Sequence, residues 1–207
     1  MAIKPILFNT EMVRANLDGR KSCIRRLVKG FVPDDAIWGY TAFTPKGYIS
    51  CRGTFADGYG EKFFKLPYQP GDILYVRETW HKGLERYMYR ADYSDTEKFY
   101  RNGKEIEMKW HPSIRMPKEA ARIWLKVTDV RVERLQEITE VGIQKEGVEV
   151  DPKECAGKFD FISELFLLFQ RLWDSTIKKS DLDRYGWDAN PYVWVIEFER
   201  CEKPEGV

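Results

Sequence analysis

The stretch "RIWLKVTDVRVERL", residues 122–135, is the longest strand signal in the chain and decides the fold class. It is rich in β-branched residues, which alternate with charged ones as in a half-buried strand. A second run of this kind, "NPYVWVIEFER" at 190–200, predicts a final strand. These two segments indicate that the centre of the protein is a β-sheet.

Shorter strands surround these two in the sequence. "PYQPGDILYVRETW", residues 67–80, predicts a turn at Pro70–Asp72 and a strand after it. "SCIRRLVK", residues 22–29, predicts another strand. Residues 30–70 are rich in glycine, proline and aromatic residues, which is typical of short strands and hairpins.

Three segments have helical spacing. Thr10 is the expected N-cap of a helix through Leu17, and Thr139 that of a short helix that stops at Gly147. "DFISELFLLFQRLWDSTI", residues 160–177, carries an apolar stripe and has Asp160 as its expected cap. We therefore predict one α+β domain over residues 1–207, with a strand-rich core, helices at its rim and a polar, tyrosine-rich insertion at 82–112.

Composition limits the possible functions. Lys and Arg total 34 against 33 Asp and Glu, so bulk charge does not favour a nucleic-acid partner and any anion site must come from local clustering. His81, His111 and the four cysteines lack metal-ligand spacing, which predicts no metal and no cofactor. With no apolar run of signal-peptide or membrane-spanning length, we expect free thiols, a cytoplasmic location and no membrane partner.

Basic residues and one thiol cluster in "NLDGRKSCIRR", residues 16–26. Within it, "GRKSCIRR" resembles the G-x-K signature of the ASCH family. "PGDILYVRE" and "VTDVRVERLQEIT" lie where that family has its later strands. Phage and prophage ASCH-like proteins are the most similar branch, since they share "KPILFNTEMV", "WHPSIRMP" and "NPYVWVIEFE". The resemblance covers nearly the whole chain.

The resemblance implies a small PUA-like β-barrel with peripheral helices and a long insertion. It also implies a cleft used on RNA or nucleosides, and one branch of the family hydrolyses N4-acetylcytidine. For that branch, Lys21 and Glu146 fall on the catalytic lysine and glutamate.

A lysine after a glycine turn, at the mouth of a barrel, can point its amine into a cleft. There Lys21 would pair with phosphate or act as a base; the alternative is a solvated turn lysine. As a rim residue, Lys21 is expected to tolerate replacement by alanine with little change in stability. For Glu146 the alternative is an exposed residue in the last turn of a helix.

Three groups are candidates for the nucleophile. Ile24 stands where the amidohydrolase branch has threonine, so water, Ser22 or Cys23 would have to attack. Cys23 is equally a candidate for a buried structural cysteine.

Further side chains are candidates for ligand binding. Arg25 and Arg26 lie on opposite faces of a strand, so we expect at most one to line the cleft. Arg77 would grip phosphate or form a cross-strand ion pair, and the tryptophans would stack on bases or anchor loops. The predicted ligand-binding residues are Arg26, Arg77, Trp80, Trp110, Ser113 and Arg115.

Three functions compete on this basis. The first is binding of RNA or a modified nucleotide in a cleft around Lys21. The second is metal-independent hydrolysis of an N4-acylated cytidine-type nucleoside. The third is protein binding by a phage accessory protein through the 82–112 insertion.

Overall fold

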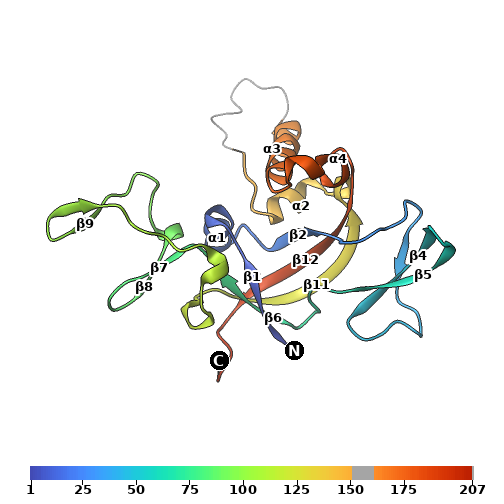
Figure 1. Ribbon diagram of the computed structural model, residues 1–207, viewed down its shortest axis with the longest axis horizontal. Coiled ribbons are helices and arrows are strands. Elements are labelled where there is room, and N and C mark those ends of the chain that lie inside the picture. Colours follow the sequence, from blue (N-terminus) through green and yellow to red (C-terminus); the bar gives the residue numbers. More distant parts are fainter. Residues whose placement is uncertain (151–160, 207) are drawn as a thin grey trace.

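A five-stranded, strongly curved sheet forms the centre of the protein (Figure 1). The computed structural model describes residues 1–150 and 161–206. The strand order is β1-β6-β11-β12-β2, with β1 parallel to β6 and the other neighbours antiparallel. The bounds are β1 Ile3–Leu7, β6 Ile73–Arg77, β11 Trp124–Arg134, β12 Tyr192–Cys201 and β2 Cys23–Leu27.

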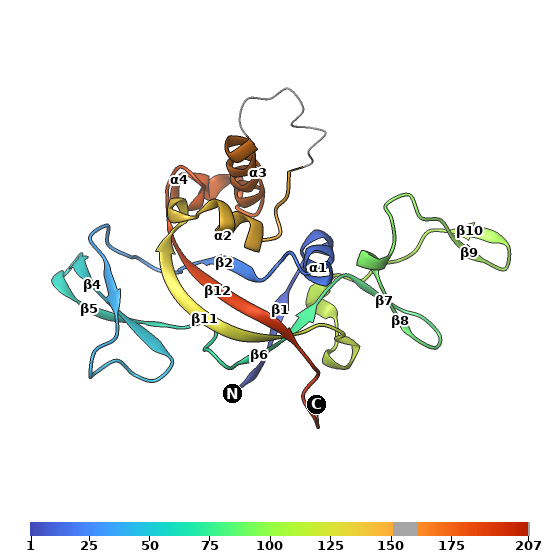
Figure 2. The same cartoon turned by 180° about the vertical axis from the view of Figure 1, so that it is seen from behind.

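The two segments that the sequence placed at the centre are paired with each other. β11 and β12 run antiparallel from the Trp124–Cys201 pair to the Arg134–Tyr192 pair, with a register shift between Val127 and Asp129. An irregularity of this kind increases the local twist and bends the strand. Both strands are long and curved in the two opposite views (Figures 1 and 2).

The predicted α+β class is confirmed, but a closed barrel is not. No backbone ladder joins β2 to β1 in the part of the chain that the structure describes. A side chain makes the connection there instead, because Arg26 Nη2 donates to the Leu7 carbonyl at 3.3 Å. Residues of both edge strands line one cavity, so we call this gap the open seam.

Helices cover one side of the sheet and one edge. They are α1 Thr10–Leu17, α2 Glu140–Lys145, α3 Phe161–Ser175 and α4 Leu182–Tyr185. Thr139 caps α2 as predicted, and Gly147 follows it with φ 85°. The predicted cap of α1 was wrong by one position. Asn9, rather than Thr10, accepts the Met12 amide at 2.8 Å, because Asn9 has the extended backbone that a cap needs. Asp160 lies outside the described residues.

Single 3₁₀ turns join several of these elements: η1 Arg90–Asp92, η2 Ser113–Arg115, η3 Lys118–Ala120, η4 Leu135–Glu137 and η5 Lys179–Asp181. No helix among the described residues combines the length and apolar character needed to cross a membrane.

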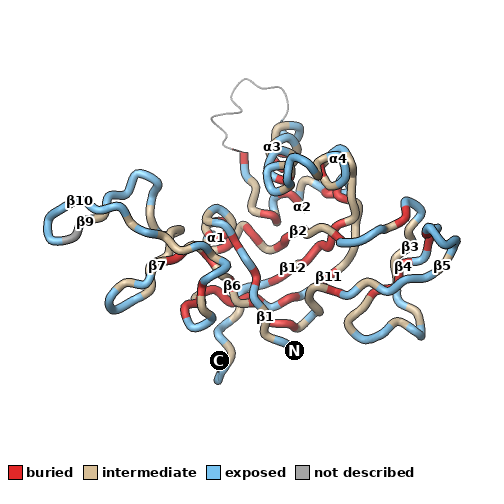
Figure 3. The backbone as a smooth tube through the Cα atoms, in the orientation of Figure 1, coloured by how far each residue is buried: buried red, intermediate tan, exposed pale blue. Residues whose placement is uncertain are grey.

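Two arms project from opposite ends of the sheet and are mostly exposed (Figure 3). The first, between residues 37 and 65, is a three-stranded sheet of β3 Ile37–Gly39, β4 Tyr48–Phe55 and β5 Gly58–Lys65, as the composition predicted. The second, segment 82–112, carries β8 Tyr87–Tyr89, which pairs with β7 Trp80–Lys82, and the hairpin β9 Phe99–Arg101 with β10 Lys104–Ile106. Its exposed apolar residues, Leu84, Tyr100 and Ile106, are divided between the two hairpins. Protein binding through this arm stays a prediction.

Both faces of the sheet are buried. On one face Ile24 and Ile196 join the largest apolar cluster, and on the other Cys23 and Val195 pack in the cluster that contains Leu165 and Phe169 of α3. Alternation along β2 therefore sends successive side chains into two different cores. Full burial of a side chain such as Leu165 contributes roughly 1.5–3 kcal/mol.

The predicted turn at Pro70–Asp72 ties the N-terminal segment to the sheet. Asp72 accepts hydrogen bonds from Lys4 Nζ at 2.7 Å, Ala2 N at 2.9 Å and Gln69 N at 3.1 Å. Burial alone would raise the pKa of Asp72, but these hydrogen bonds outweigh it and hold the pKa below its ordinary value.

Asp72→Asn is expected to lower the free energy of unfolding by about 1–3 kcal/mol at neutral pH. Because the folded pKa lies below the ordinary 3.8, the carboxylate stabilises the fold above that value, and this contribution is lost as the pH falls through the folded pKa. Urea unfolding in a series of acidic buffers should therefore show the wild type and the variant converging. A difference that stays constant with pH would contradict this role of Asp72.

Candidate functional site

Lys21 and Glu146, 125 positions apart in sequence, form an ion pair at the open seam. Lys21 Nζ lies 2.8 Å from Glu146 Oε2, 2.8 Å from the Glu146 carbonyl and 2.7 Å from the Cys23 carbonyl. A lysine ammonium has three N–H donors, so these partners use all of them. The Lys21 side chain is 0% exposed and the Glu146 side chain 7%.

The predicted position of Lys21 at an exposed rim was therefore wrong. Helix α2 ends directly over it, and Gly147 makes the close approach possible, since a Cβ there would lie 2.7 Å from Ala15 Cβ and 3.1 Å from Lys21 Cβ. The helix end supplies both the carboxylate and a carbonyl to the amine. Lys21 holds Glu146 in place and does not present a free charge to a ligand.

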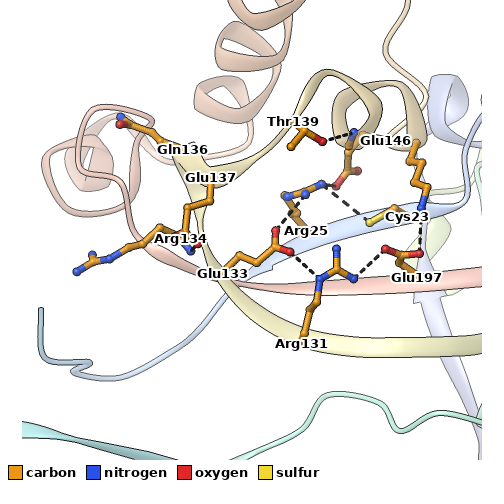
Figure 4. Close-up of polar contacts among 12 residues, drawn as sticks. Cys23, Arg25, Arg131, Glu133, Arg134, Gln136, Glu137, Thr139, Glu146 and Glu197 are labelled. Carbon is orange, nitrogen blue, oxygen red and sulfur yellow. Dashed lines mark hydrogen bonds and ion pairs between the residues drawn. The ribbon is translucent and has the colours of Figure 1, made fainter. Parts of the chain in front are cut away.

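Arg25 is the second cation on Glu146. Its Nη1 lies 3.3 Å from Glu146 Oε1 and its Nη2 3.3 Å from Glu133 Oε2, and its side chain is 4% exposed. Figure 4 shows the guanidinium between the two carboxylates. Arg25 therefore links α2 to β11 through the site.

A network of alternating charges continues from Glu133 across the sheet (Figure 4). Arg131 contacts Glu133 at 2.6 Å and Glu197 at 2.8 Å, and Lys145 contacts Glu197 at 3.1 Å. Burial alone would raise the pKa of Glu197, but the hydrogen bonds from Arg131 and Lys145 lower it. These contacts fix the orientation of Arg25 and, through it, of Glu146.

Cys23 has the environment of a structural cysteine. Burial raises the pKa of its thiol to about 12, and the nearby Glu146 charge adds to the rise. Because the thiolate is the reactive form, this environment disfavours Cys23 as a nucleophile at neutral pH.

A cavity of about 550 Å³ lies at the open seam, and we call it the main cavity because Glu146 and Arg25 line it; a cavity of about 590 Å³ lies in the second arm. Glu146 and Arg25 reach the main cavity, and Lys21 lies behind them. Ile24 lines it too, so the position where the resemblance implied a hydroxyl carries an apolar side chain at the cavity wall. Its walls are largely apolar and include Leu7, Phe8, Met12, Leu27, Phe169, Leu172, Trp173 and Ile177.

Two of the predicted ligand-binding residues, Arg26 and Ser113, line this cavity. Arg25 lines it as well, which corrects the expectation that only one of the adjacent arginines would do so. The reason is that β2 is an edge strand beside the open seam, so the cavity is reached from both of its faces.

The other four predicted residues do not line the main cavity. Arg77 Nε donates to the Met116 carbonyl at 2.7 Å. Trp80 is buried against Tyr87 and His111, with ring centroids 5.6 Å and 5.1 Å away, so it anchors the base of the second arm. Trp110 packs within that arm against Tyr93 and Phe99, and Arg115 is exposed.

Sequence reasoning missed the wall that α3 provides. Phe169 and Leu172 belong to segment 160–177, whose apolar stripe is a pattern typical of a core-facing helix. In the structure all three residues Phe169, Leu172 and Trp173 line the cavity; Phe169 and Trp173 are buried, and Leu172 is 38% exposed. Helical spacing of apolar residues does not tell whether these residues pack against a sheet or line a cavity.

Within residues 1–150 and 161–206, the structure contains no group of three or more His, Cys, Asp and Glu side chains that could hold a metal ion. Comparisons of the chain with family models, with curated proteins and with solved structures found no match.

Proposed function

We propose that the main cavity binds the nucleobase of a nucleotide or of an RNA. The observation that carries this proposal is a cavity of about 550 Å³ with apolar walls and a fixed acceptor and donor, Glu146 and Arg25, on its surface. Small-ligand sites typically enclose about 300–1,000 Å³, with mostly apolar walls and a few placed polar groups.

The chemistry of the two charged groups matches the edge of a base. Glu146 accepts hydrogen bonds and the guanidinium of Arg25 donates them, while each nucleobase carries a donor next to an acceptor on its pairing edge. Leu7 and Leu172 line the cavity and are 37% and 38% exposed, so they supply apolar surface for the faces of the base.

Calorimetric titration with the common and acetylated nucleosides, their monophosphates and short single-stranded RNAs tests this proposal. We expect saturable binding by the wild type and its loss in Leu172→Trp, which places a larger side chain in the cavity. Leu167→Trp is the matched control, because Leu167 lies on the same helix and is 37% exposed but does not line the cavity. Absence of binding by every probe, or equal binding by both variants, would overturn the proposal.

A second candidate is hydrolysis of an N4-acylated cytidine, favoured by the 2.8 Å contact between Lys21 Nζ and Glu146 Oε2. Glu146 would take a proton from water as the water attacks the acyl carbonyl. The C–N bond then breaks, and the proton passes to the leaving amine, giving a carboxylic acid and cytidine.

The same titrations decide between the two candidates when N4-acetylcytidine is included and acetate is measured. Hydrolysis requires acetate release that is lost in Glu146→Gln and kept in Cys23→Ala, since the thiol is protonated. Binding of N4-acetylcytidine without acetate release would exclude hydrolysis, and only the binding proposal would remain.

A further inference from the structure

The charges around the main cavity are unevenly compensated. Glu146 is paired with Lys21 and Arg25, and Arg25 is also paired with Glu133. By contrast, Arg26 and Lys29 line the cavity without an ion-pair partner in the portion of the chain described by the structure. The wall formed by the end of β2 is therefore positively charged.

Most N–H donors of Arg26 make no hydrogen bond to the described residues. A guanidinium has five N–H groups, and here one of them donates to the Leu7 carbonyl at a long 3.3 Å. The Nε atom of Arg26 is buried and has no hydrogen-bond partner among the described residues. Lys29 follows three positions later, and its side chain is exposed. Arg26 and Lys29 thus place two cations on the cavity wall, in addition to the ion-paired group of Glu146, Lys21 and Arg25.

We infer that the ligand of the main cavity carries a phosphate, held by Arg26 with Lys29, so that nucleotides bind more tightly than nucleosides. This inference rests on the proposed function and adds the anionic half of the ligand to it. A phosphate supplies both the missing negative charge and the acceptor oxygens that a guanidinium fork matches. Ser113, from η2, adds a hydroxyl to the same cavity.

The test compares cytidine, uridine, adenosine and guanosine with their 5′-monophosphates by calorimetry, with inorganic phosphate as a separate probe. Charge-assisted hydrogen bonds of this kind are expected to make the preferred monophosphate bind about 10- to 100-fold more tightly than its nucleoside. The preference should shrink at high salt, because the cations are partly exposed.

Arg26→Ala is expected to remove most of this preference while the nucleoside still binds, and Arg26→Lys to restore part of it. Arg115→Ala is the matched control, because Arg115 is exposed and lies outside the cavity wall. Melting temperatures of all three variants show whether each is folded.

The outcomes separate this inference from the proposed function. Equal affinity for nucleoside and monophosphate overturns the phosphate site and leaves the base site standing. If neither the nucleosides nor the monophosphates bind, the phosphate site and the proposed base site are both overturned. A preference that survives in the Arg26→Ala, Lys29→Ala double variant also overturns the assignment. A short RNA included in the series tells whether the phosphate comes from a polynucleotide or a free nucleotide.

Discussion

Lys21→Met is expected to lower the free energy of unfolding by about 3–5 kcal/mol, because it removes one partner of a buried ion pair. The side chains of Lys21 and Glu146 are 0% and 7% exposed, so water does not replace the lost partner. The substitution also leaves the carbonyls of Cys23 and Glu146 without the amine that they share. Urea unfolding followed by circular dichroism measures the loss.

A paired variant shows whether the effect is electrostatic. Lys21→Met combined with Glu146→Leu replaces the pair by apolar groups, and this double variant should regain part of the stability lost in the single one. Lys62→Met is the matched control, because Lys62 contacts Asp57 at 3.3 Å in an exposed pair whose removal should change stability little. If the two lysine variants were equally stable, the buried pair would not have the structural role described above.

A loss of about the same size, 3–5 kcal/mol, is expected for Arg122→Met. Glu78 is 1% exposed and receives two hydrogen bonds from Arg122, at 2.9 Å and 3.0 Å. Arg122 also contacts Asp92 at 2.7 Å and lies 4.0 Å from the centre of the Tyr89 ring. Its removal leaves a buried carboxylate without a cation where the second arm joins the sheet.

The pH dependence of the stability of Arg122→Met shows whether the unpaired Glu78 carboxylate causes the loss. Burial raises the pKa of Glu78 above its ordinary 4.5, although Arg122 opposes the rise. Without Arg122 the folded pKa rises further, so stability falls as the pH increases from 4.5 through the folded value.

We therefore expect the wild type and Arg122→Met to differ more at neutral pH than in acid, in denaturant unfolding at both conditions. Lys126→Met serves as the control, since Lys126 forms an exposed pair with Glu199 at 3.7 Å. If Arg122→Met lowered the free energy of unfolding by the same amount at every pH, the loss would come from packing of Arg122 on Tyr89 instead of from the charge of Glu78.

The sheet and helices could be predicted because their signals are local. Alternation in 122–135 and 190–200 gave β11 and β12, and Thr139 with Gly147 gave both ends of α2. The closure of the sheet is not local. It depends on whether β1 and β2 come within backbone hydrogen-bonding distance, and no pattern within either strand encodes that distance.

The candidate site was predicted only in part, for a similar reason. The resemblance placed Lys21 and Glu146 at related positions, and the structure brings them together. Their burial follows from the end of α2 packing on the turn after α1, a contact between segments far apart in sequence. The role of Arg25 as a bridge depends on Glu133 from β11, which no spacing near Arg25 reveals.

The open seam bears on how substitutions along β2 would affect binding of the proposed ligand. In a closed barrel, the outward main-chain groups of β2 would be occupied by β1. An edge strand has no neighbouring strand to pair such N–H and C=O groups, and residues 24–27 of β2 border the main cavity. Main-chain atoms are common to every amino acid, so a contact of the proposed ligand with them would persist through side-chain substitution along β2.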